Sequence, residues 1–282
     1  CILLFSSFSL ALSDDISDAK AAYEAQNYKT AYYLYQKAAR QGSTEAQLWL
    51  GIMYYYGVGI PQDYAKAEEW YQKSAEQGNV NAQFLLGNMY ATGIGVARDY
   101  AKAIVWMRKA ALQGDTRAQK IVGSFYENGL GTSQDFTEAL KWYQMAAERG
   151  DVDAQRKLAE MYFVGKAGIH DPAETVKWLS KAANQGDIES QCKLGGIYFY
   201  GLGVPQDYKK AVSLFEKADG CRDPEIQFYI GIIYYEGRGV NQDYTKAEKW
   251  FSKAAKLGNV DAQYSLGLMY ALGKGVEQSG AV

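Results

Sequence analysis

The sequence predicts an all-α protein, a right-handed α/α superhelical solenoid of antiparallel helical hairpins. Three residues recur every 36 positions, seven times each and without a slip. They are a glutamine (from Gln47 to Gln263), a tyrosine (from Tyr54 to Tyr270) and a glycine (from Gly57 to Gly273). A period between about 20 and 50 residues is typical of repeat arrays in which each unit packs against its neighbours.

The first element is an apolar, uncharged stretch, residues 1–12 (CILLFSSFSLAL), which is followed abruptly by Ser13, Asp14 and Asp15. Its composition is typical of the apolar region of a signal peptide, and Ala11 and Ser13 are small residues suitably placed for cleavage before Asp14. A short buried strand or helix is the alternative. Twelve residues are too few to span a bilayer. We therefore predict that residues 1–13 are the remnant of a signal peptide and that the mature chain has no stable membrane insertion.

The rest of the chain divides at the repeat boundaries. Residues 14–43 contain a shorter hairpin, Ser17–Gly42, with only a few loop residues, which we expect to cap the stack. Six complete repeats occupy residues 44–259. Residues 260–282 hold one helix of a seventh repeat, which we interpret as truncated because repeat arrays normally end in a polar cap.

Each repeat predicts two helices. In the first, Ala46, Leu50 and Tyr54 fall on one helical face. Gly57 ends this helix, since glycine tolerates the left-handed conformation that follows a helix end. Asp63 is then a natural N-cap for the second helix. This aspartate recurs as Asp99, Asp135, Asp171, Asp207 and Asp243.

A further glycine recurs in the middle of the first helix, where it costs about 1 kcal/mol relative to alanine. It is found at Gly51, Gly87, Gly123, Gly195, Gly231 and Gly267, and position 159 is alanine instead. A cost repeated at six equivalent positions predicts close approach of two helices. We expect the bulky partner to be the tryptophan of the second helix, Trp70 in the first repeat.

The repeat motif, A-x-A-Q-x-x-L-G-x-x-Y-x-x-G-x-G-V-x-x-D-Y-x-K-A-x-x-W-Y-x-K-A-A-x-x-G, resembles the Sel-one-like repeat, a relative of the tetratricopeptide repeat with a longer inter-helix loop. Residues 81–114 (NAQFLLGNMYATGIGVARDYAKAIVWMRKAALQG) match it closely. The resemblance covers Thr44 to about Val276. It implies that the first helices line a concave binding surface, and it implies roles in envelope signalling, host interaction or assembly of larger complexes.

Composition and motifs argue against catalysis. The formal charge is −2, with no long run of one sign, so we expect no nucleic-acid partner. The chain has one histidine, His170, in an irregular loop, which we interpret as a solvated residue. HExxH, CxxC and GxSxG patterns do not occur, and the recurring Gly-x-Gly follows no strand. We predict no catalytic residue, no metal and no cofactor.

Two cysteines remain if Cys1 is removed. Cys192 lies near the start of one first helix, and Cys221 follows the end of the second helix of the same repeat. In an antiparallel hairpin these two ends lie side by side, so a disulfide between Cys192 and Cys221 is one reading, and two separate buried thiols are the other. The resemblance supports the bond, because cysteine-rich exported members of the family staple each hairpin.

Recognition is expected at positions of the first helices that vary between repeats. Both ends of this row are aromatic and its middle is charged, and aromatic residues are common anchors of protein interfaces. The alternative for each residue is packing against the neighbouring hairpin. The candidates are Trp49, Ile52, Tyr55, Tyr56, Phe84, Asn88, Lys120, Arg156, Lys157, Glu160, Phe199, Tyr200, Phe228, Tyr229, Tyr235 and Glu236.

These observations predict an exported, non-enzymatic adaptor that binds a protein or peptide. A periplasmic or secreted bacterial protein is favoured over one of a eukaryotic secretory lumen, because no Asn-x-Ser/Thr sequon occurs. Two alternatives stay open: a cell-wall-active or β-lactam-binding protein, as proposed for some cysteine-rich relatives, and a glycan-binding repeat protein.

Overall fold

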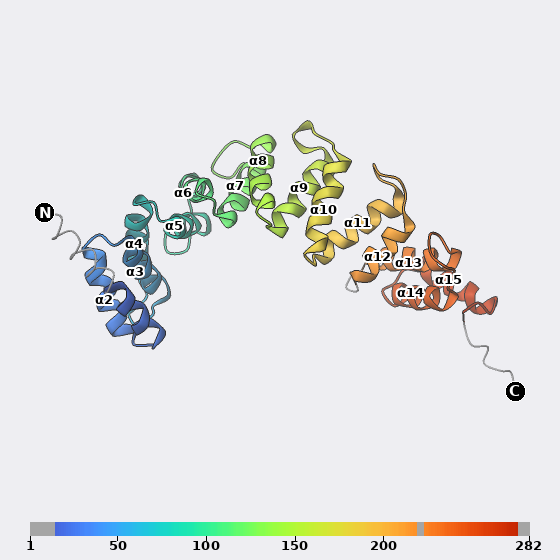
Figure 1. Cartoon of the computed structure of the whole chain (residues 1–282), viewed down its shortest axis with the longest axis horizontal. Helices are drawn as coiled ribbons and strands as arrows, with labels where there is room; N and C mark the ends of the chain where they lie inside the picture. The colour runs from blue at the N-terminus through green and yellow to red at the C-terminus, as the bar shows by residue number, and fades with distance from the viewer. Residues whose placement is uncertain (1–14, 219–222, 276–282) are drawn as a thin grey trace. The chain divides into compact units, whose positions relative to one another are not determined.

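The computed structural model describes residues 15–218 and 223–275, and within them it confirms the all-α solenoid (Figure 1). Every regular element in these ranges is a helix, and helices adjacent in the chain pack against each other within each unit. The chain divides between Arg149 and Gly150 into two compact units. The predicted signal-peptide remnant, residues 1–13, lies outside the described residues.

The first unit contains a helix through residues 15–24 and seven helices of 12 residues or more. Their bounds are α2 (Tyr28–Arg40), α3 (Thr44–Tyr56), α4 (Tyr64–Glu76), α5 (Val80–Thr92), α6 (Tyr100–Leu112), α7 (Thr116–Asn128) and α8 (Phe136–Glu148). The described part of the second unit contains α9 (Val152–Val164), the short 3-10 helix η1 (Lys166–Gly168), α10 (Pro172–Asn184), α11 (Ile188–Tyr200), α12 (Tyr208–Lys217), α13 (Pro224–Glu236), α14 (Tyr244–Lys256) and α15 (Val260–Ala271).

Helix ends follow the predicted signals. Gly57 ends α3 with a left-handed φ of 68°. The Asp63 carboxylate accepts a hydrogen bond from the backbone N–H of Lys66 at 3.0 Å and so caps α4. Backbone hydrogen bonds explain the pKa of Asp63, which is held below its ordinary value chiefly by the Lys66 N–H. The five equivalent aspartates cap α6, α8, α10, α12 and α14 in the same way.

The mid-helix glycine does lie at a close helix–helix contact, but the expected partner was wrong by one residue. A Cβ added at Gly51 would lie 2.4 Å from the ring of Tyr71, not beside Trp70. Tyr71 is 1% exposed because its face of α4 turns toward α3, whereas Trp70 is half-buried under the Lys73 ammonium at 4.5 Å. The same pairs recur as Gly87–Met107, Gly123–Tyr143, Gly195–Phe215 and Gly231–Phe251.

The recurring glutamine links each hairpin to the one before it. The Gln83 amide donates to the backbone carbonyl of Ala75 at 3.1 Å, near the end of the preceding helix, where carbonyls lack helical partners. Gln113 in turn donates to the Gln83 side-chain carbonyl at 2.8 Å. Equivalent bonds to a carbonyl eight residues earlier are made by Gln47, Gln119, Gln191 and Gln263.

The recurring tyrosine is also structural. The Tyr90 hydroxyl donates to the Glu68 carboxylate of the preceding hairpin at 2.5 Å, and the Lys102 ammonium lies 5.1 Å from the centre of the Tyr90 ring. Burial, together with this hydrogen bond, raises the pKa of Tyr90. Tyr234 pairs in the same way with Glu216, and Tyr270 with Glu248. These contacts join consecutive hairpins through their side chains.

The irregular loop after α9 keeps the contacts of the regular loops with different residues. In regular loops a glutamine side chain donates to the last turn of the first helix, as Gln62 does to the Tyr55 carbonyl at 2.7 Å. His170 stands at the same position and its Nδ1 lies 2.9 Å from the Phe163 carbonyl oxygen. His170 is therefore an exposed residue that replaces the loop glutamine.

Candidate functional site

Most predicted binding residues at the start of the array are packing residues. The Trp49 ring stacks on Tyr35, with centroids 5.7 Å apart and planes 8° apart, and it also lies against Tyr23. Tyr55 is half-buried and contacts Tyr64 edge-on at 5.2 Å. Tyr56, by contrast, is 65% exposed. In this part of the first unit, Tyr56 is the predicted aromatic residue that is open to a partner.

The remaining predicted residues of the first unit are partly buried. Ile52 is partly buried against the hydrophobic core. Phe84 is half-buried, and the Arg117 guanidinium lies 4.2 Å from its ring centre. Asn88 and Lys120 are half-buried on α5 and α7. None of these four residues is fully exposed to a partner.

The predicted aromatic residues of the second unit form one cluster on α11 and α13. Phe199 is buried and stacks on Tyr229 at 4.7 Å, and Tyr200 meets Tyr229 edge-on at 5.5 Å. Phe228 leans on Phe251 at 5.6 Å. Burial and a hydrogen bond with Tyr229 raise the pKa of Tyr200. Tyr200 nevertheless keeps half of its surface exposed.

The last two predicted residues, Tyr235 and Glu236, already have partners in the chain. Tyr235 contacts Tyr244 edge-on at 5.3 Å, and the Lys274 ammonium lies 3.3 Å from its hydroxyl. Glu236 pairs with Arg238. Both sets of contacts lie at the end of α13.

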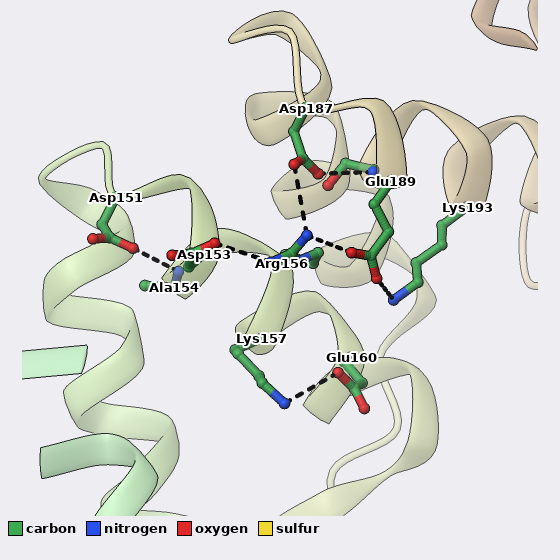
Figure 2. Close-up of polar contacts among 10 residues, drawn as sticks. Asp151, Asp153, Ala154, Arg156, Lys157, Glu160, Asp187, Glu189 and Lys193 are labelled. Carbon is green, nitrogen blue, oxygen red and sulfur yellow. Dashed lines mark hydrogen bonds and ion pairs between the residues drawn. The ribbon is translucent and has the colours of Figure 1, made fainter. Parts of the chain in front are cut away.

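Three charged residues of the predicted row, Arg156, Lys157 and Glu160, lie on α9, where Lys157 pairs with Glu160 and Arg156 pairs with acidic residues of α9 and α11. Figure 2 shows Arg156 reaching from α9 toward Asp187 and Glu189 at the start of α11. Arg156 also binds Asp153 at 3.0 Å, and Lys193 binds Glu189 at 2.8 Å. Few of these charged groups are buried, so each ion pair contributes little to the stability of the fold. The larger effect of the ion pairs is to fix the Arg156 side chain across two helices.

Beside this network lies an apolar hollow of about 250 Å³, formed by α9, α10, α11 and the loop that follows α11. Its apolar walls include Phe163, Tyr200 and Leu202, which are 43%, 50% and 44% exposed. Three charged residues line it: Arg156, Glu160 and Lys193. The other lining residues are Ala159, Thr175, Leu179, Gly196 and Ile197.

Two residues that are smaller than their counterparts in other repeats explain why the hollow forms here. Gly196 stands where other repeats have Ile52, Ser124 or Ile232, and a Cβ added to it would meet nothing within 4 Å. A mid-helix glycine costs about 1 kcal/mol relative to alanine, and at Gly196 no close packing requires it. In the same region Leu179 replaces the buried ring found at Tyr71 and Phe215.

A second hollow, of about 220 Å³, shares Phe163, Thr175 and Leu202 with the first and reaches His170 in the irregular loop. Of the predicted site residues, the structure thus places Arg156, Glu160 and Tyr200 around one hollow. Sequence reasoning missed the other eight lining residues. The signal that could have found them was the Gly195–Gly196 pair, since the second glycine has no counterpart in the repeat.

The described ranges contain neither a group of metal-holding side chains nor a membrane-spanning helix. Among residues 15–218 and 223–275 there is no group of three or more His, Cys, Asp or Glu side chains arranged to hold a metal ion. In the same ranges, no helix has the length and apolar character needed to cross a membrane. Cys192 on α11 is disulfide-bonded. Cys221 lies outside the described residues, so the pairing of Cys192 with Cys221 stays a prediction.

Comparison with known proteins identifies the family. The model of the Sel1 repeat matches residues 22–43, 44–79, 80–115, 116–151, 152–187, 188–218, 224–259 and 260–281. The chain belongs to the Sel1 repeat family. Sel1 repeat proteins are generally protein-interaction scaffolds, and nothing in this Sel1 array shows catalysis. No curated protein matches the chain.

Two solved Sel1 repeat structures are similar over most of this chain. A Sel1 repeat protein from Oxalobacter formigenes is 30% identical, with a TM-score of 0.71, over 86% of this chain and 99% of its own. The protein c5321, a protective antigen present in uropathogenic Escherichia coli strains, is 34% identical, with a TM-score of 0.51, over 89% of this chain. This chain covers 61% of the length of c5321.

Proposed function

We propose that the protein is an exported, non-enzymatic adaptor that binds a protein or peptide through the exposed variable positions of its first helices. One observation carries this proposal. The residues that recur every 36 positions are taken up by contacts within and between hairpins, as Gln83 and Tyr90 are, whereas Tyr56 and Tyr200 at variable positions remain at least half exposed. Exposed tyrosines are suited to anchor a partner.

Export is supported by two observations. Residues 1–13 have the composition of a signal-peptide remnant. The similar E. coli protein c5321 is a protective antigen, which is consistent with a surface or secreted location for a relative. We therefore place this adaptor in the periplasm or outside a bacterial cell, with a role in envelope signalling or host interaction. In this organisation residues 14–43 cap the array, residues 44–259 form six repeats, and residues 260–282 begin a seventh.

Capture from envelope and host extracts, with bound proteins identified by mass, tests the proposal. The double variant Tyr56→Ser/Tyr200→Ser is expected to lose the captured protein. Tyr33→Ser is the matched control, because Tyr33 is 66% exposed but lies on α2, a second helix. Trp49 is unsuitable for this test because its ring packs on Tyr35. Covalent labelling by a β-lactam, or glycan-array binding without protein capture, would overturn the adaptor proposal.

A further inference from the structure

The hollow on α9, α10 and α11 has the size of a side-chain receptor. Drug-sized ligands and cofactors usually occupy pockets of roughly 300–1,000 Å³, and this hollow measures about 250 Å³. The hydroxyl of Thr175, one of its lining residues, is already used within the chain, because it donates to the Asp171 carbonyl at 2.8 Å. The space therefore suits one bulky apolar side chain rather than a polar metabolite.

Open apolar side chains surround this space. Phe163 on α9, Tyr200 at the end of α11 and Leu202 in the loop that follows keep 43–50% of their surfaces exposed. Burial of such surface by a partner is favourable in proportion to the area removed from water. Gly196 forms part of the floor, and it is the residue whose side chain would otherwise occupy the space.

The charges at the edge discriminate between partners. Arg156 is surrounded by the carboxylates of Asp153, Asp187 and Glu189, and Lys193 shares Glu189. Glu160 is different. Among the described residues, its nearest cation is the Lys157 ammonium at 3.6 Å, and its carboxylate makes no hydrogen bond. The edge thus presents two paired cations, Arg156 and Lys193, and one carboxylate, Glu160, whose only ion pair within the described ranges is the 3.6 Å contact to Lys157.

Two carboxylates drawn in Figure 2, Asp151 and Asp187, accept hydrogen bonds from backbone N–H groups at the N-termini of α9 and α11 and are balanced in part by the helix dipoles. Glu160 lies away from a helix N-terminus, and its one ion pair in the part of the chain that the structure describes is the contact to Lys157 at 3.6 Å. A cation on a partner would give Glu160 a second ion pair.

We infer that this hollow binds a peptide segment in which a Leu, Met or Phe side chain fills the space and an adjacent Lys or Arg pairs with Glu160. The inference rests on the proposed adaptor function and specifies the chemistry of its partner. A peptide with an acidic residue beside the apolar anchor is disfavoured, because its carboxylate would face Glu160.

Fluorescence anisotropy with short labelled peptides tests the inference. The probes are eight-residue Gly/Ser peptides that contain Leu-Lys, Phe-Lys, Leu-Ser, Leu-Glu or Ser-Lys at the centre. We expect Leu-Lys and Phe-Lys to bind the full chain. Replacing Lys by Ser should weaken binding about threefold, as for a partly exposed ion pair. Replacing the apolar anchor by Ser should weaken binding at least about tenfold.

Three variants assign the binding to this hollow. Gly196→Leu fills the space and should weaken Leu-Lys binding at least about tenfold. The midpoint temperature of thermal unfolding should not fall in this variant, because leucine favours a helix more than glycine does. Glu160→Gln should remove the preference for Lys over Ser but keep the preference for Leu. Ser124→Leu, at the equivalent position of α7, is the matched control and should leave every affinity unchanged.

The inference is overturned if the folded Gly196→Leu variant binds Leu-Lys as the wild type does, if Leu-Glu binds as well as Leu-Lys, or if no probe binds at millimolar concentration. These outcomes differ from failure of the adaptor proposal. A partner captured in a manner dependent on Tyr56 and Tyr200 but insensitive to Gly196→Leu would leave the adaptor function standing and remove only the peptide receptor.

Discussion

The hairpin α3–α4 and the hairpin α9–α10 share one 36-residue frame but fill it differently. In the first, Gly51 lies directly under the ring of Tyr71. In the second, the equivalent positions hold Ala159 and Leu179, and both residues line the hollow. The N-caps of the second helices, Asp63 and Asp171, are the same in both. The difference teaches that the repeat fixes the backbone, whereas a few pairs of side chains decide whether the space between helices is filled.

The largest expected effect concerns the contact between the two helices of each hairpin. Gly51→Val should lower the free energy of unfolding by about 3 kcal/mol, because the side chain must displace a buried ring. Ala159→Val should cost about 1 kcal/mol or less, since its extra methyl groups can enter the hollow. Urea denaturation of the two variants measures both. Equal losses would show that the α3–α4 and α9–α10 contacts are packed alike.

A double substitution tests the same comparison between the two hairpins. Tyr71→Leu combined with Gly51→Ala gives α3–α4 the pair that α9–α10 has naturally. We expect the double variant to be more stable, by about 1 kcal/mol, than the sum of the two single losses predicts. A double-mutant cycle in urea gives this coupling energy, and a coupling of zero would separate the two positions.

The shared part of the repeat should respond equally in both units. Gln119→Ala and Gln191→Ala each remove a hydrogen bond to a carbonyl eight residues earlier, at 3.0 Å in both, and neither side-chain carbonyl accepts a hydrogen bond from a described residue. Each should lower the free energy of unfolding by about 1–2 kcal/mol, because a buried acceptor loses its donor. Unequal losses, measured by chemical denaturation, would mean that the inter-hairpin contact differs between the units.

Low pH should destabilise the first unit through Asp115, the N-cap of α7. Burial alone would raise the pKa of Asp115, but hydrogen bonds from Arg117 and from the Ala118 backbone N–H hold it below its ordinary value of 3.8. A carboxyl with a lowered pKa stabilises the fold fully above 3.8, and this contribution is lost as pH falls through the folded-state value. Asp115→Asn should therefore flatten the dependence of unfolding free energy on pH below 4. An unchanged slope would exclude Asp115 as a contributor.

The smallest effect lies in the irregular loop. Ala167 has a left-handed φ of 58°, at the position where regular loops have a glycine such as Gly59. Ala167→Gly should stabilise the protein by up to about 1 kcal/mol, because alanine is strained in this region. Gly59→Ala should instead destabilise it, since a Cβ there would lie 2.3 Å from the Cβ of Tyr28. Thermal unfolding of both variants reports the two signs.

The helix ends and N-caps could be predicted from the sequence because their signals recur at a fixed spacing. The N-cap at Asp63 and the helix end at Gly57 could be placed from spacing alone, and the structure confirms both. The partner of Gly51 could not, because periodicity places Trp70 and Tyr71 on neighbouring faces that only tertiary packing distinguishes. For the same reason Trp49, predicted as a binding residue, is instead packed on Tyr35.

The hollow was harder to predict because it results from small side chains, and small side chains carry no chemical signature. Arg156, Glu160 and Tyr200 were predicted from their variable positions, but Gly196 and Leu179 were not. Their importance follows only when α9, α10 and α11 are seen together. A glycine without a periodic counterpart was the available clue.

Site-specific photo-crosslinking tests most directly the central claim, that a partner binds where the repeat leaves its space unfilled. The photoreactive residue p-benzoylphenylalanine replaces Phe163 or Tyr200 at the hollow, or Tyr33, which is exposed on the second helix α2, and the chain is irradiated with its captured partner. We predict crosslinks from positions 163 and 200 and none from position 33. Crosslinks from position 33 alone, or equally from all three, would contradict the account.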